Sequence, residues 1–86
     1  MIYTLTFNCH GKSYMNSQTV PGKYLPNQYE AVACGLLLGK IELNRLKRDD
    51  VYTDLCLVEQ GEIEGTRVDN VVWNAEQYIP ISQEVK

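Results

Sequence analysis

The side chains best suited to chemistry are a few cysteines, one histidine and a set of carboxylates. Cys9 immediately precedes His10, the single histidine of the chain. Neighbouring residues of a strand point to opposite faces, so Cys9 and His10 form a poor nucleophile–base pair. The three cysteines and His10 could supply four zinc ligands, but there is no C-x2-C pair, and Cys34 and Cys56 fall inside a predicted helix and a predicted strand. We therefore expect no catalytic residue, no metal and no cofactor; a small enzyme that uses Cys9 and His10 is an alternative.

The carboxylates are concentrated in the second half of the chain. Residues 1–48 carry six basic and two acidic side chains, whereas residues 49–86 carry two basic and nine acidic ones. Glu62 and Glu64 would project from one face of an extended segment about 6–7 Å apart, a spacing that could imitate successive phosphates toward a basic cleft. The asymmetry predicts an acidic face for a basic partner. The alternatives are that folding mixes the two halves and that these acids form a solvated strand face.

Motifs and net charge argue against several other functions. The chain contains no GxxxxGK[ST], GxGxxG or GxSxG pattern, which argues against nucleotide binding and hydrolase chemistry of those types. The basic residues of segment 40–48 could contact a nucleic-acid backbone. However, Asp49 and Asp50 follow at once and the formal net charge is −3, so the sequence argues against nucleic-acid binding. A nucleic-acid-binding accessory protein is kept as an alternative.

Cysteine usage and hydropathy predict the compartment. Three widely spaced cysteines, an odd number, favour a reducing environment. Residues 1–8 show no basic segment before an apolar run, so we expect no signal peptide. The longest apolar stretch, residues 31–39, is too short to span a bilayer. The expectation is a cytoplasmic protein without membrane contact.

Apolar alternation and turn residues predict one small α+β domain over residues 1–86. This length suffices for a single domain with a thin core. His10-Gly11 is typical of a two-residue hairpin turn, and a second hairpin could turn at residues 60–61 or at residues 64–65. The predicted elements are strands at about 2–9, 12–20, 51–60 and 66–73, a helix at about 27–48 and a tail at 74–86. They give the order ββαββ, a four-stranded antiparallel sheet with one long helix packed on one face.

The predicted helix is apolar on two sides. Its residues 31–39 include no polar side chain. At about 100° per residue, one stripe forms the predicted sheet-packing face: Tyr29, Val32, Leu36, Gly39, Leu43 and Leu46. A second stripe lies on roughly the opposite side: Cys34, Leu37, Leu38 and Ile41. Because a helix that is apolar all round is covered on more than one side, the second stripe predicts contact with the chain's own tail, a second copy of the chain or another protein.

These observations favour a small non-catalytic protein-binding module, an inhibitor or adaptor that docks on a larger protein with a basic surface. Small acidic domains without catalytic motifs are often carried by phages and mobile elements to block nucleic-acid-processing or defence proteins. Six tyrosines add amphipathic side chains of the kind enriched at interfaces, and we expect exposed ones to contribute. The predicted partner-binding residues are Asp54, Glu59, Glu62, Glu64, Asp69, Tyr52 and Trp73. A structural homodimer is an alternative.

Overall fold

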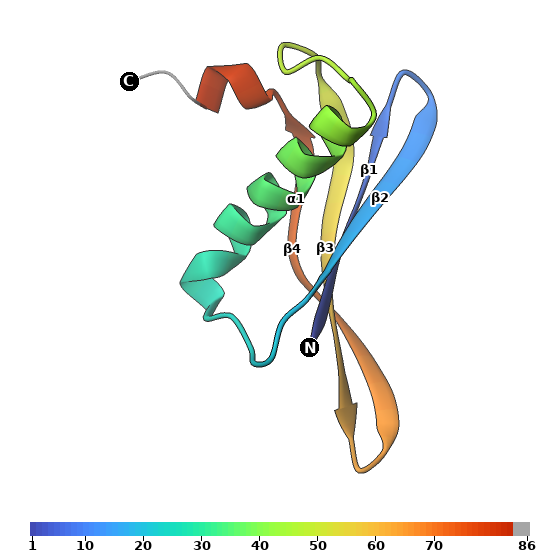
Figure 1. The fold of residues 1–86 in the computed structure, drawn as a ribbon, viewed down its shortest axis with the longest axis vertical. Helices are drawn as coiled ribbons and strands as arrows, with labels where there is room; N and C mark the ends of the chain where they lie inside the picture. The colour runs from blue at the N-terminus through green and yellow to red at the C-terminus, as the bar shows by residue number, and fades with distance from the viewer. Residues whose placement is uncertain (84–86) are drawn as a thin grey trace.

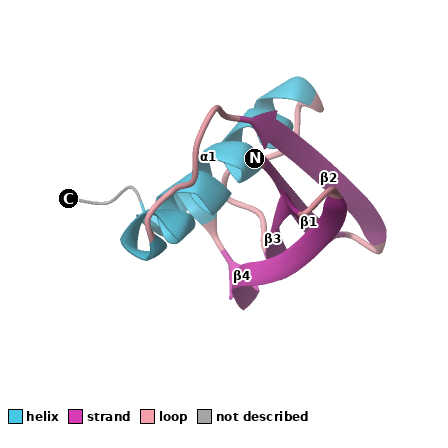
Figure 2. Cartoon of the chain, turned by 90° about the horizontal axis from the view of Figure 1, so that it is seen from below, coloured by secondary structure: helices cyan, strands magenta, loops and turns pink. Residues whose placement is uncertain are grey.

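The structure, a computed structural model, describes residues 1–83 and has the predicted order of elements (Figure 1). The elements are β1 (Ile2–Cys9), β2 (Lys12–Thr19), the 3-10 turn η1 (Pro26–Gln28), α1 (Tyr29–Leu43), β3 (Tyr52–Ile63), β4 (Thr66–Tyr78) and the 3-10 turn η2 (Pro80–Gln83). The strands form one antiparallel sheet in the order β2-β1-β3-β4. Seen from below, α1 lies against one face of a strongly twisted sheet (Figure 2). The predicted ββαββ architecture is therefore confirmed.

The first hairpin follows the sequence prediction closely. His10 and Gly11 both have left-handed backbone, with φ of 52° and 75°, as a two-residue turn between antiparallel strands requires. This turn places Phe7 directly opposite Tyr14, and the two rings stack with centroids 5.5 Å apart. The turn and the aromatic pair together fix the register of β1 on β2.

The second hairpin turns at Glu64 and Gly65, whose φ values are 52° and 81°. Its strands are longer than predicted, and the predicted start of the tail at residue 74 is wrong. Residues 74–78 continue β4, and pairing with β3 extends to the contact between Tyr52 and Tyr78. Pro80 cannot donate to a ladder, and the strand ends shortly before it. The part of the predicted tail beyond residue 83 lies outside the described residues.

Helix α1 ends at Leu43, five residues before the predicted end at Arg48. Arg45 has φ of 55°, its N–H donates to Glu42 O, and the N–H of Leu46 donates to Ile41 O. This is the Schellman closure of a helix, in which glycine normally takes the left-handed position. Arginine in that position hides the helix end from the sequence pattern.

The helix packs on the sheet through a stripe that only partly matches the predicted one, because Leu36 is buried there as expected. Its buried residues are Ala33, Leu36, Leu37 and Ile41. Leu37 and Ile41, expected to contact the tail, a second chain or another protein, are instead in the core. Cys34 of the same stripe does contact the predicted tail, since its thiol donates to the Tyr78 hydroxyl at 3.0 Å. Leu43, expected to face the sheet, is 76% exposed. The stripes were misplaced because an all-apolar segment has no polar side to orient it.

The core lies between α1 and the two central strands. Strand β1 contributes Tyr3, Leu5, Phe7 and Cys9, and β3 contributes Tyr52, Leu55 and Leu57. On the opposite face of the sheet, Met15 and Val71 are exposed. Within residues 1–83, no helix combines the length and the apolar character needed to cross a bilayer.

Candidate functional site

The predicted partner-binding residues do not form one surface. Glu59 and Tyr52 are buried, and Trp73 is partly buried against the core. Asp54 lies in the half of β3 that pairs with the end of β1 beside the first hairpin turn. The remaining acids are exposed on the second hairpin: Glu62, Glu64 and Asp69. Only these three match the expected acidic surface. The prediction that all seven residues form one binding surface is therefore wrong.

Tyr52 is a core residue rather than a partner contact. Its ring meets Phe7 edge-on with centroids 5.6 Å apart, and its hydroxyl donates to the backbone carbonyl of Lys47 at 2.5 Å. Burial raises the pKa of Tyr52 to about 12. None of the chain's tyrosines, all of which lie within the described residues, is fully exposed, so the expectation of exposed tyrosines is wrong.

Glu59 is a buried carboxylate held by neighbours from three segments. It accepts a hydrogen bond from the Tyr3 hydroxyl at 2.7 Å and a longer one from the Tyr29 hydroxyl at 3.5 Å. Lys23 Nζ lies 3.8 Å from the other carboxylate oxygen. The Tyr3 hydroxyl also accepts the N–H of Tyr24 at 2.9 Å. A buried charge is tolerated only when paired and hydrogen-bonded, so Glu59 joins the sheet to the helix start and does not meet a partner.

Asp54 and Trp73 both make contacts within the sheet. Asp54 has φ of 54° at a bulge between β1 and β3, where its carboxylate accepts from Asn8 Nδ2 at 3.1 Å. Trp73 pairs with Leu57 and packs against the core cluster. Neither residue continues the acidic surface of the second hairpin.

The second hairpin extends past the rest of the sheet. Strand β1 pairs with β3 only as far as the contact of Ile2 with Gln60. Residues 61–68, called the arm below, continue beyond that point as two strands (Figure 1). Ile63, next to its tip, is 63% exposed. The arm is thus an exposed two-stranded projection of defined register.

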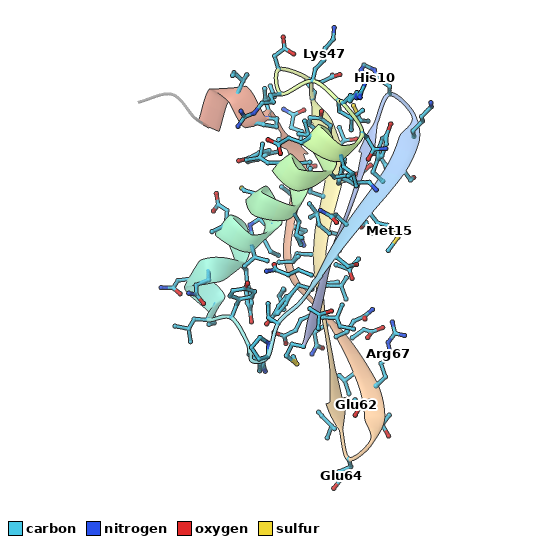
Figure 3. All side chains as sticks on the ribbon, viewed as in Figure 1. His10, Met15, Lys47, Glu62, Glu64 and Arg67 are labelled. Carbon is cyan, nitrogen blue, oxygen red and sulfur yellow. The ribbon has the colours of Figure 1, made fainter. Side chains whose placement is uncertain are left out.

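Charge on the arm is mainly negative. Figure 3 shows Glu62, Glu64 and Arg67 on the arm. Arg67 lies opposite Glu62 across the strands, and its Nε donates to Asp69 at 3.0 Å at the base of the arm. Glu64 occupies the first turn position, so Glu62 and Glu64 do not follow one strand face as the sequence predicted. The arm therefore presents one carboxylate on its β3 strand and one at its tip.

A second cluster joins Cys9, His10 and Asp50 at the opposite end of the sheet. One donor atom from each residue lies within 4.8 Å of the others. His10 Nε2 is 2.5 Å from Asp50 Oδ2, and the N–H of Val51 donates to Asp50 Oδ1 at 2.8 Å. The sequence predicted that the side chains of Cys9 and His10 point to opposite faces of a strand. The turn predicted at His10 requires a positive φ, and this departure from strand geometry is the feature that lets the two side chains converge.

The contacts of this cluster bear on the enzyme alternative at Cys9 and His10. A nucleophilic cysteine is activated by an adjacent base or by a lowered pKa, whereas His10 Nε2 and the Cys9 thiol here both interact with Asp50. Burial, followed by the charge of Asp50, raises the pKa of the Cys9 thiol and disfavours the thiolate. The geometry gives no support to the enzyme alternative at Cys9 and His10.

The contacts of Asp50 predict an acid-dependent part of the stability. The hydrogen bond from Val51, followed by that from His10, lowers the pKa of the Asp50 carboxyl below its ordinary 3.8. A lowered folded-state pKa adds stability above the unfolded value, and this part is lost as the pH falls through the folded value. With metal ions removed by EDTA, we expect the free energy of urea unfolding at about pH 5 to be higher for wild type than for Asp50→Asn. This difference should close below pH 3.8.

The control is Asp49→Asn, which removes a neighbouring charge but neither hydrogen bond of Asp50. A gap between wild type and Asp50→Asn that persists unchanged at the lowest pH would contradict the assignment.

Comparison of the chain with models of protein families, with curated proteins and with solved structures gave no match. The arm and the Cys9–His10–Asp50 cluster both combine exposed side chains with a defined geometry.

Proposed function

We propose that this chain is a non-catalytic protein-binding module that docks through its arm on a larger protein with a basic surface. The observation that carries the proposal is the extension of residues 61–68 beyond the sheet. A two-stranded hairpin without a supporting layer is marginally stable by itself in water. A partner would cover the arm and stabilise it.

The backbone of the arm supports docking by strand addition. Strand β4 is the edge of the sheet, and the arm portion of β3 has passed the end of its pairing with β1. Unpaired N–H and C=O groups along an edge are the template on which a strand of another protein adds. Ile63, exposed next to the tip, supplies an apolar anchor.

The charge of the arm supports a basic partner. Glu62, Glu64 and the adjoining Asp69 outnumber Arg67, the basic residue of this segment. Complementary charge accelerates encounter and selects the orientation of docking. An inhibitor or adaptor of the kind carried by phages and mobile elements, which occupies the basic nucleic-acid cleft of a processing or defence protein, is the specific role that we propose.

Site-specific photocrosslinking tests whether the arm meets a partner. A photoreactive residue at position 63 is compared with one at Leu43, which is also highly exposed but lies at the end of α1. We expect position 63 to crosslink to one protein with a basic surface and position 43 not to do so. Equal labelling at both positions, or none at position 63 in the native host, would count against the proposal.

The acidic residues of the arm are tested by charge reversal. In Glu62→Lys/Glu64→Lys, we expect binding to the crosslinked protein to weaken at least roughly tenfold and to depend less on salt. Glu30→Lys/Glu42→Lys makes the same change in net charge on exposed positions of α1 and is the matched control. Isothermal titration calorimetry measures both. Equal weakening by the two double variants would mean that only net charge matters, contrary to the proposal.

A further inference from the structure

We propose that Cys9, His10 and Asp50 form a binding site for a divalent transition metal of the zinc class. The site lies where the β1–β2 turn meets the segment before β3, at the end of the sheet away from the arm. The proposal goes beyond the protein-binding function and does not depend on it.

The three donor atoms suit such an ion in kind and in spacing. Zn²⁺ accepts thiolate, imidazole and carboxylate ligands at about 2.0–2.3 Å, which places ligand atoms of a tetrahedral site about 3.3–3.8 Å apart. The Cys9, His10 and Asp50 donors already lie within 4.8 Å of one another. The 2.5 Å contact between His10 and Asp50 would open by about 1 Å to admit the ion. His10 can make this movement because its side chain is 75% exposed.

Backbone geometry holds the donors together before any ion binds. In a regular strand, the side chains of Cys9 and His10 would point to opposite faces. The left-handed backbone of His10 instead brings its ring to the carboxylate that also faces Cys9. The N–H of Val51 holds Asp50 Oδ1 and leaves Oδ2 directed at the site, in the manner of an outer-shell hydrogen bond that orients a ligand.

The burial of the donors indicates an open site with three protein ligands. Cys9 is buried, whereas the side chain of His10, labelled in Figure 3, is largely exposed. An ion would enter from the solvent side and keep water in its fourth position, as in zinc sites with three protein ligands. Binding would displace the proton of the Cys9 thiol into solvent, so affinity should rise with pH.

Cobalt titration of the reduced full chain tests the site, because Co²⁺ reports thiolate ligation by its absorption. We expect saturation at one equivalent, a thiolate-to-cobalt charge-transfer band in the near ultraviolet, and loss of the band when Zn²⁺ is added. Cys9→Ser should abolish the band, and His10→Asn and Asp50→Asn should weaken binding at least roughly 100-fold, since even outer-shell changes cost 10–100-fold. Cys34→Ser/Cys56→Ser removes the other two cysteines and should leave the band unchanged.

His10→Asn provides a second test of the site if Cys9→Ser does not fold. Asn-Gly is the preferred pair for this type of turn, so the variant loses the imidazole but retains the hairpin. Zn²⁺ should raise the unfolding temperature of wild type but not that of His10→Asn. Three results would overturn the proposal: no saturable Co²⁺ binding by wild type up to about 1 mM, a band that persists in Cys9→Ser, or wild-type affinity in His10→Asn.

Discussion

Leu37→Ala is expected to lower the free energy of unfolding by about 2–5 kcal/mol, the range for truncation of a buried leucine. Leu37 is fully buried between α1 and the sheet, so alanine would leave a cavity there. Leu43→Ala makes the same chemical change at an exposed position of α1, where we expect an effect within about 0.5 kcal/mol. Urea denaturation of both variants measures the difference.

This pair of variants distinguishes the observed packing from that predicted by the sequence. If Leu43 faced the sheet and Leu37 a second chain, the order of the two effects would reverse. The effect of Leu37→Ala would also vary with protein concentration, because dimer stability depends on it. A large, concentration-independent effect at Leu37 alone is the result that the structure requires.

Tyr3→Phe is expected to lower the free energy of unfolding by about 2–3 kcal/mol. The variant removes the short hydrogen bond to buried Glu59 and leaves the N–H of Tyr24 without its acceptor. Hydrogen bonds to charged groups contribute about 1.5–3 kcal/mol, and an unsatisfied partner adds to the loss. Urea denaturation with an unchanged m-value would show that only stability has changed.

Tyr29→Phe is the matched control. The Tyr29 hydroxyl of wild type lies 3.5 Å from the same carboxylate, a longer contact than that of Tyr3. We therefore expect the variant to lose less than about 1 kcal/mol of the free energy of unfolding. Equal losses in Tyr3→Phe and Tyr29→Phe would contradict the assignment of Tyr3 as the principal partner of Glu59.

The first hairpin and the order of the elements could be predicted because local residues specify them. His10 and Gly11 suit a left-handed turn, and Tyr3, Leu5, Phe7 and Cys9 lie at every second position of the first strand and are all buried. The end of the helix could not be predicted because Arg45 takes a position where glycine is the usual marker. The sequence predicts the end of an element only where the residue at that position is of the type usually found in that backbone conformation.

In β3, the sequence pattern contained the information needed to predict the burial of Glu59 but not that of Tyr52. Glu59 continues the alternation of Leu55 and Leu57, so its inward direction was present in the sequence pattern. The burial of Tyr52 was hidden, because the bulge at Asp54 adds one residue and reverses the alternation before it. The convergence of Cys9, His10 and Asp50 depends on tertiary contact across 40 residues of sequence.

Shortening the arm tests the proposed function most directly. Glu62 pairs with Arg67 and Ile63 with Thr66, so deletion of these four residues removes two cross-strand pairs and retains the Glu64-Gly65 turn. The even number removed from each strand preserves the direction of every remaining side chain. The measurement is the affinity of this variant for the protein crosslinked at position 63, with the unfolding midpoint as the check on folding. A folded variant that binds at least roughly 100-fold more weakly is the predicted result, and a folded variant with wild-type affinity would contradict docking through the arm.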